Sequence, residues 1–328
     1  MSVDRLHPAP PARDRALAWA RMWRFHFVPL SLSAGLVGMT APHDGATTAS
    51  VVVGLLLCVF GYGIGVVIND WFDREADAVN APDRPFVAGL IHPHVGLGLT
   101  LALSTVLLVA AFAVAPPLAV WSAVAVAGHL VYTWTKGVPM LGNLANGVDM
   151  ALFTVLGAVA VRPDAGWLDI PGVTWFHTAL VAVVLSGFCL VGYFKDIEGD
   201  RVAGYRTLPV AIGPGPSSRI AVVFPVVAVA AVAVAAVVRP DGLDADPTAA
   251  FWVLLAVAAL AFAQSITTLL RAPVANAYEA LLWFTRATTL FVLTLGALHE
   301  PLPFLLGAVP MMAYLELTLR ATQTSRQA

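Results

Sequence analysis

The chain has 328 residues, of which 59% are hydrophobic and 12% are charged, and its mean hydropathy is +0.81. Soluble domains carry about 25% charged residues, so this composition excludes an ordinary soluble protein and predicts an all-α, polytopic membrane bundle. A formal net charge of −2 provides no basic surface for nucleic acid.

The chain is expected to form one integral-membrane domain over residues 1–328. Residues 1–19 are interpreted as a cytosolic tail, because prolines and arginines leave no apolar core for a signal peptide. Residues 320–328 form a C-terminal tail. Ten apolar segments, each near the length that crosses a bilayer, lie between the tails at about 23–40, 50–69, 95–115, 117–135, 144–161, 174–194, 217–238, 249–270, 279–298 and 301–319. The last two segments are close together and the first is weakly apolar, so nine helices remain an alternative.

The basic residues predict which side of the membrane each loop faces. With the N-terminus inside, 15 of the 18 lysines and arginines fall on the inner side, Arg162 and Arg239 fall outside, and Arg286 lies within a helix. Cytosolic loops collect lysine and arginine, so both termini are expected inside. The two long, charged inner loops, near 70–94 and 195–216, are the candidates for a cytosolic active site.

The first of these loops opens with an acidic cluster that contains Asp70, Asp73 and Asp77. If the preceding helix continues through the cluster, these carboxylates are spaced three and four residues apart and share one face. Like charges at that spacing repel each other, so a bound cation is expected to stabilise them. Asn69 precedes the cluster and Arg84 follows it.

The second loop repeats this arrangement. Asp196 and Asp200 are four residues apart at the end of an apolar segment, and basic residues surround them at Lys195, Arg201 and Arg206. Both clusters are expected at the same membrane face. The repeat predicts a distant internal duplication of one helix and its acidic loop.

Carboxylates without a cysteine or histidine cluster are typical ligands of Mg²⁺. Mg²⁺ is commonly held by one or two carboxylates together with substrate phosphates. The nearby arginines and lysines suit the remaining phosphate charge. Because the clusters adjoin the membrane, the rest of the substrate is expected to be apolar, and a prenyl diphosphate meets both demands.

Three motifs resemble the signatures of the UbiA superfamily of intramembrane prenyltransferases. They are Asn69-Asp70-x-x-Asp73-x-x-x-Asp77 with Asn80 and Arg84-Pro85; Lys195-Asp196-x-x-Gly199-Asp200 with Gly204 and Thr207-Leu208-Pro209; and Tyr132-x-x-x-Lys136 with Gly142-Asn143. The resemblance implies two aspartate-rich motifs on cytosolic loops over a central cavity. It also implies Mg²⁺-dependent ionisation of a prenyl diphosphate and transfer of the prenyl group to a lipophilic, aromatic or hydroxylated acceptor.

The resemblance assigns roles to individual residues of this chain. The catalytic and metal-binding residues it implies are Asp70, Asp73, Asp77, Asp196 and Asp200. The residues it implies for the diphosphate and the prenyl chain are Asn69, Arg84, Tyr132, Lys136, Asn143, Tyr193, Lys195, Arg201 and Arg206. The aromatic residues near the predicted mouth are candidates to shelter a carbocation: Trp71, Phe72, Tyr132, Trp134, Tyr193 and Phe194.

One position departs from the family pattern. Many members carry an additional aspartate three residues before the position of Asp196, where this chain has Tyr193. This departure keeps a second function open, that of a UbiA-type terpene cyclase acting on farnesyl or geranylgeranyl diphosphate. The first motif is similar to those of chlorophyll synthases and archaeal-lipid geranylgeranyl transferases, which favours a long prenyl donor.

A few ionisable residues fall inside the apolar segments. Asp149 is a candidate to hold an acceptor or to take a proton, although a place at the membrane interface is an alternative. Arg286 is expected to pair with Glu279 on the same helix face. The lone histidines His129 and His177 are interpreted as structural, and Cys58 and Cys189 as small buried hydrophobic residues.

Overall fold

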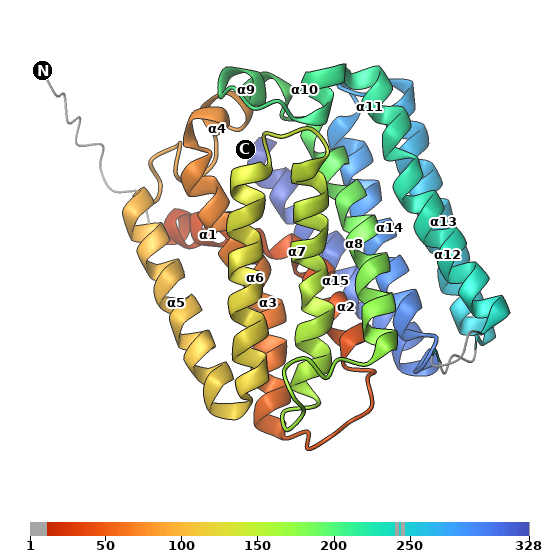
Figure 1. Cartoon of the computed structure of the whole chain (residues 1–328). Helices are drawn as coiled ribbons and strands as arrows, with labels where there is room; N and C mark the ends of the chain where they lie inside the picture. Colours follow the sequence, from red (N-terminus) through yellow and green to blue (C-terminus); the bar gives the residue numbers. More distant parts are fainter. Residues whose placement is uncertain (1–11, 240–242, 244–246, 328) are drawn as a thin grey trace, which may run out of the picture.

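The described residues, 12–239, 243 and 247–327, form helices and loops in the computed structural model, without strands among them (Figure 1). The elements in chain order are α1 (Ala12–Met22), the 3-10 helix η1 (Phe25–Phe27), α2 (Val28–Gly38), α3 (Thr48–Phe72), α4 (Arg74–Asn80), α5 (Pro93–Val114), α6 (Pro116–Thr135), α7 (Leu141–Ala160), α8 (Gly172–Tyr193), α9 (Ile197–Val202), α10 (Leu208–Ile212), α11 (Pro214–Ala221), α12 (Val223–Val238), α13 (Ala249–Arg271), α14 (Ala277–Gly296) and α15 (Pro301–Gln327). The predicted all-α class is confirmed.

Local sequence explains where several helices begin. The Thr47 hydroxyl accepts a hydrogen bond from the Ser50 backbone N–H at 3.0 Å, and the Thr47 N–H donates back to Ser50 Oγ at 3.1 Å. This capping box starts α3. Proline stands in the first turn of both α5 and α6, where its missing N–H costs no helical hydrogen bond.

Within the described part of the chain, eight helical stretches are long and apolar enough to cross a membrane. They are α3, α5, α6, α7, α8, the run Pro214–Val238 of α11 and α12, α13, and Pro301–Ala321 of α15. Helix α14 has 20 residues and is buried along most of its length. On the outer surface, large apolar side chains such as Phe112 and Val237 are about 70% exposed, as lipid-facing residues would be.

The segment predicted at 23–40 is not a single spanning helix. Arg24 takes a left-handed conformation (φ 46°), which separates α1 from η1, and α2 has only 11 residues. A helix of that length is about 16 Å long, roughly half of the hydrocarbon core. Its backbone instead packs closely on α7, because a Cβ on Gly157 would lie 1.9 Å from the Gly35 carbonyl oxygen.

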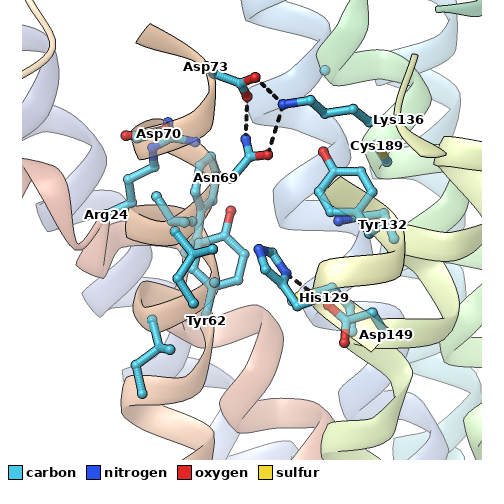
Figure 2. Close-up of a pocket in the computed structure, with 18 of the residues that line it drawn as sticks. Arg24, Tyr62, Asn69, Asp70, Asp73, His129, Tyr132, Lys136, Asp149 and Cys189 are labelled. Carbon is cyan, nitrogen blue, oxygen red and sulfur yellow. Dashed lines mark hydrogen bonds and ion pairs between the residues drawn. The ribbon is translucent and has the colours of Figure 1, made fainter. Parts of the chain in front are cut away.

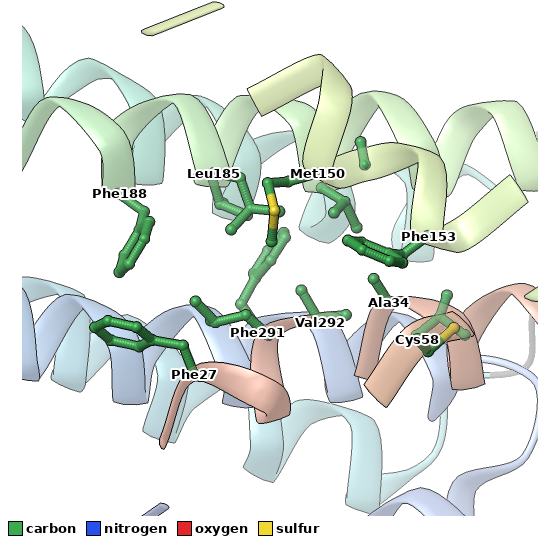
Figure 3. Packing of buried hydrophobic residues seen from close by; sticks show 14 of the residues in the cluster. Phe27, Ala34, Cys58, Met150, Phe153, Leu185, Phe188, Phe291 and Val292 are labelled. Carbon is green, nitrogen blue, oxygen red and sulfur yellow. The ribbon is translucent and has the colours of Figure 1, made fainter. Parts of the chain in front are cut away.

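The core lies where α2, α7, α8 and α14 meet. Phe27 packs edge-on against Phe188 of α8 with 5.6 Å between ring centroids, and Figure 3 shows Met150 and Phe291 nearby in the same layer.

Arg286 of α14 donates to Glu316 of α15 at 2.5 and 3.0 Å, so the predicted pairing with Glu279 is wrong. Glu316, on the neighbouring helix, is the acidic residue that lies within hydrogen-bonding distance of Arg286.

The two ends of the bundle differ. Helices α4, α9 and α10 gather at one end (Figure 1), so both acidic loops lie on the same side, as the sequence predicts. At the opposite end, the loops after α2 and α7 are joined by the hydrogen bond from Asp44 N–H to the Val161 carbonyl, at 3.0 Å.

Candidate active site

A cavity of about 300 Å³ opens between the helices beneath α4 and α9. Its upper end is polar and contains both acidic clusters, whereas the rest of its lining is mainly apolar. The apolar lining includes Leu57, Ile64, Leu107, Val126, Met150, Phe153, Leu156 and Phe188. The shape suits an elongated molecule with a charged head and a hydrocarbon tail.

The first acidic cluster sits at a bend, not along one continuous helix. Helix α3 ends at Phe72, and Asp73 (φ −87°, ψ 7°) joins it to α4. The bend keeps Asp70 and Asp77 on the cavity side. Asp70 Oδ1 accepts from Arg24 Nη2 at 2.7 Å and from Arg84 Nη1 at 3.0 Å, and Arg84 also pairs with Asp77.

Asp73 is the centre of a second group of contacts. Its carboxylate forms an ion pair with Lys136 at the end of α6 and accepts from Asn69 Nδ2 at 2.7 Å (Figure 2). The Tyr205 hydroxyl donates to Asp73 Oδ1 at 3.1 Å, and the Lys136 ammonium lies 4.7 Å from the centre of the Tyr205 ring. Both Asp73 and Lys136 are buried, so their charges act with little screening by water.

The second acidic cluster follows α8 in the same way. Asp196 precedes the first turn of α9 and pairs with Lys195 at 2.6 Å. Asp200, inside α9, accepts from the Thr207 hydroxyl at 3.0 Å. The repeated helix, bend and short acidic helix is the geometry that an internal duplication predicts.

One amide side chain joins the two clusters. Asn80, at the end of α4, donates to the Asp196 carbonyl at 2.9 Å and accepts from the Gly199 N–H at 2.8 Å. A Cβ on Gly199 would lie 2.3 Å from Asn80 Nδ2 and 2.4 Å from the Ala76 carbonyl oxygen. The absence of a side chain at Gly199 therefore allows α9 to approach α4 this closely.

Two of the carboxyl groups have raised pKa values. Burial raises the pKa of Asp77 to about 6, although Arg84 partly opposes the shift. Burial and the nearby negative charge of Asp196 raise the pKa of Asp200 to about 7. A positive ion beside these groups would favour their charged forms.

The donor set fits Mg²⁺ held jointly with phosphate. No group of three acidic, histidine or cysteine side chains among the described residues is close enough to form a metal site by itself. Mg²⁺ usually takes only one or two carboxylates from a protein and fills its other positions with water and substrate phosphates. The residues that would hold it here are Asp70, Asp73, Asp77, Asp196 and Asp200, which all line the cavity.

The structure brings most of the predicted site residues to this cavity. Its lining contains Asn69, Asp70, Asp73, Asp77, Arg84, Tyr132, Lys136, Tyr193, Lys195, Asp196 and Asp200. Three predicted residues lie outside the lining. Arg201 is 58% exposed and pairs with Glu198 at 2.9 Å, Arg206 is exposed, and Asn143 is buried in α7.

Sequence reasoning missed several lining residues. Arg24 is one of the basic residues predicted on the inner side, and its contact with Asp70 depends on a chain bend that the sequence does not reveal. His129, interpreted as structural, pairs with Asp149 at 3.0 Å and faces the cavity. Of the aromatic residues expected near the mouth, Tyr132 and Tyr193 line the cavity, while the remaining lining aromatics are Phe27, Tyr62, Phe153, Phe188, Tyr205 and Tyr278.

The fold is shared with known membrane proteins. A UbiA homologue from Aeropyrum pernix K1 matches with a TM-score of 0.67 and 21% identity, covering 82% of this chain and 95% of that one. A UbiA homologue from Archaeoglobus fulgidus, solved bound to GPP and Mg²⁺, matches with a TM-score of 0.61 and 18% identity, covering 86% and 99%.

Sequence comparison leads to the same group. The chain is 36% identical over 198 residues to a digeranylgeranylglyceryl phosphate synthase of Natronomonas pharaonis, covering 58% of this chain and 65% of the relative, just under two thirds of its length. It is 37% identical over 211 residues to the synthase of the same name from Halobacterium salinarum, covering 62% and 69%. The UbiA prenyltransferase family model matches residues 31–285. This chain therefore belongs to the UbiA prenyltransferase family.

Proposed function

We propose that this protein transfers a prenyl group from a prenyl diphosphate to a hydroxyl group of a glyceryl phosphate lipid, with Mg²⁺ as cofactor. The observation that carries the proposal is a cavity that has both acidic clusters at one end and mainly apolar side chains along the rest of its lining. A diphosphate with bound Mg²⁺ fits the acidic end, and a prenyl chain fits the apolar part.

The residues at the polar end favour departure of the diphosphate. When bound, Mg²⁺ neutralises charge that develops on the leaving diphosphate. The five aspartates would hold the metal ions, and Arg84 and Lys136 would place positive charge beside the phosphate oxygens. The bond from C1 of the prenyl chain to oxygen breaks, and its electron pair leaves with the diphosphate.

The apolar end protects the allylic cation that remains. Side chains such as Phe153 and Phe188 exclude water, which would otherwise capture the cation. Tyr62, Tyr132 and Tyr193 also line the cavity, and their aromatic rings can stabilise a positive charge by cation–π interaction. The acceptor oxygen then forms a bond to C1, and the hydroxyl proton is lost.

The named relatives support the choice of donor and acceptor. Digeranylgeranylglyceryl phosphate carries two geranylgeranyl groups on a glyceryl phosphate, so the last transfer to it requires an acceptor that already carries one. We infer geranylgeranyl diphosphate as the donor and geranylgeranylglyceryl phosphate as the acceptor for this chain. The relatives and solved structures give no support to the terpene cyclase alternative.

The active site is proposed to face the cytosol. The excess of lysine and arginine at the end that carries α4 and α9 supports this orientation, because cytosolic loops retain these residues. We also propose that the chain forms a single catalytic domain, since both halves contribute residues to one cavity.

The test is an assay of the purified protein with both proposed substrates. Release of diphosphate and formation of the ether product are measured separately, with and without Mg²⁺. The wild-type protein should form both only with Mg²⁺. The Asp73→Asn variant should lose about 100-fold or more of both activities, because it removes a carboxylate from the centre of the polar end.

The matched control is Glu75→Gln. Glu75 lies on the same short helix but is exposed and does not line the cavity, so its activity should equal that of the wild type. Equal activity of Asp73→Asn and Glu75→Gln would rule out the assigned site. Absence of donor consumption by the wild-type protein would rule out the proposed reaction.

A further inference from the structure

A second polar pair lies deeper in the same cavity, below the residues assigned to the diphosphate. His129 of α6 and Asp149 of α7 both line the cavity, and His129 Nδ1 lies 3.0 Å from Asp149 Oδ2. Figure 2 shows the pair below Asn69 and Lys136, with His129 between Asp149 and the wall that carries Tyr62. Neither residue contacts the acidic clusters.

The position of His129 along the helices is informative. It precedes Lys136 by seven residues on α6, so the two side chains share a face and lie about 10 Å apart along the axis. The ring also packs against Gly65 of α3, where a Cβ would lie 2.8 Å from His129 Cε1, and Gly65 is one turn before Asn69. His129 therefore lies between the polar end of the cavity and its apolar part. C1 of a bound donor, which joins the diphosphate to the hydrocarbon chain, is expected at this depth.

The hydrogen bonding of this pair leaves one nitrogen available. With its proton on Nδ1, His129 donates to Asp149 and keeps the lone pair of Nε2. Nε2 is buried and has no hydrogen-bond partner among the described residues. Buried polar atoms rarely lack a partner, and ionisable residues within membrane spans are usually functional.

A hydroxyl that attacks an allylic cation must lose its proton. The apolar side chains of the cavity cannot accept a proton, the five aspartates are assigned to the metal ions, and Lys136 is already paired with Asp73. Two cavity-lining side chains have a buried polar atom without a hydrogen-bond partner among the described residues, His129 and Tyr193, and the imidazole nitrogen is a far stronger base than a phenol oxygen.

We propose that His129 is the general base for the acceptor hydroxyl and that Asp149 is its positioning residue; this rests on the proposed transfer to a hydroxyl. As the new bond from oxygen to C1 forms, the hydroxyl proton moves to His129 Nε2. The resulting imidazolium is stabilised by the Asp149 carboxylate through Nδ1–H. No oxidation or reduction takes place, and the diphosphate leaves with its electron pair as before.

The experiment separates ionisation of the donor from capture by the acceptor. Purified His129→Gln is given geranylgeranyl diphosphate, geranylgeranylglyceryl phosphate and Mg²⁺, and both diphosphate and ether are quantified. Diphosphate release should stay within about threefold of the wild type, because the polar end is intact. Ether formation should fall about 100-fold or more, and the prenyl group should appear as an alcohol or an eliminated diene.

Two further variants test the assigned roles. Adding imidazole to His129→Ala should restore ether formation, since the freed space can admit the lost base. Asp149→Asn should lower kcat for ether formation by about 10-fold or more while leaving KM for the prenyl diphosphate unchanged. The matched control is Thr133→Val, because Thr133 bonds only to the His129 carbonyl and does not line the cavity; it should behave as the wild type.

The outcomes distinguish this proposal from the proposed function. Donor consumption by the wild type with an unchanged ether yield in His129→Gln overturns the base and leaves the transferase intact. If His129→Gln also loses diphosphate release, the imidazole experiment decides, and lack of rescue overturns the base. A wild-type protein that consumes no donor overturns the transferase and the base with it.

Discussion

Lys136 is the cation with the most contacts at the polar end of the cavity. Its ammonium pairs with Asp73, lies 3.2 Å from Asn69 Oδ1 and sits over the Tyr205 ring. Lys195, the counterpart near the second cluster, pairs with Asp196 but keeps 31% of its side chain exposed. A buried charge acts more strongly on a ligand than an exposed one, because water screens the exposed charge.

We therefore expect the two lysines to differ in activity assays. Lys136→Gln should reduce diphosphate release by about 100-fold, because a fixed, water-excluded positive charge is lost beside the leaving group. Lys195→Gln should cost less than about 10-fold, since a partly exposed ion pair contributes little. Steady-state rates at saturating donor measure both. Equal losses would show that burial does not set the contribution of these charges.

Helices α4 and α9 depend on their close approach across the top of the cavity. The side chain of Asn80 contacts the backbone of the second acidic segment, and Gly199 leaves the space for it. The clusters are therefore positioned by one another as well as by the spanning helices below. A change at this contact should alter the active site without changing the bundle.

Gly199→Ala tests this contact. The added Cβ would meet Asn80 and the Ala76 carbonyl, so α9 must move away from α4. We expect about 10-fold or more weaker binding of prenyl diphosphate, with little change in thermal unfolding of the bundle. The control is Gly215→Ala in α11, where a Cβ would meet no atom within 4 Å. Unchanged donor binding in Gly199→Ala would show that the contact has no functional effect.

The ion pair between α14 and α15 can be tested by a double-mutant cycle. Arg286→Met and Glu316→Met should each lower the thermal unfolding midpoint, because each leaves one charge unpaired within the span. The double variant should be no less stable than either single variant. The expected coupling is about 1 kcal/mol. Additive losses would show that the two side chains do not interact in the membrane protein.

The sequence predicts elements better than contacts between elements. Runs of about 20 apolar residues locate most spanning helices, and the spacing of Asp70, Asp196 and their neighbours locates the two clusters. Contacts between Arg24 and Asp70, or between His129 and Asp149, join residues on different helices. Such pairs depend on which helices are neighbours, and hydropathy carries no information about that arrangement. The same limit explains the wrong partner predicted for Arg286.

At the scale of the whole molecule, the proposed orientation in the membrane can be tested by labelling single cysteines at the two ends of the bundle. Cys58 and Cys189 are both buried, so they should not react with a polar thiol reagent. Single cysteines can then be introduced at Val202, which is 69% exposed at the α9 end, and at Asp164, which is exposed in the loop after α7.

An impermeant maleimide should label Asp164→Cys in intact cells and Val202→Cys only after the cells are opened. This result follows from the distribution of basic residues, which predicts that the α9 end faces the cytosol. The wild-type chain controls for reaction at the native thiols. Labelling of Val202→Cys alone in intact cells would reverse the proposed orientation.

The contact of Asn80 with Gly199 joins residues that lie on opposite sides of the loop between α7 and α8. If the polypeptide were severed in that loop, each fragment would carry only one acidic cluster, and neither could hold the metal-bound headgroup alone. Turnover by two co-produced fragments would then report that they had reassembled in the bilayer. The rate of turnover would therefore measure how efficiently the two halves associate in the membrane.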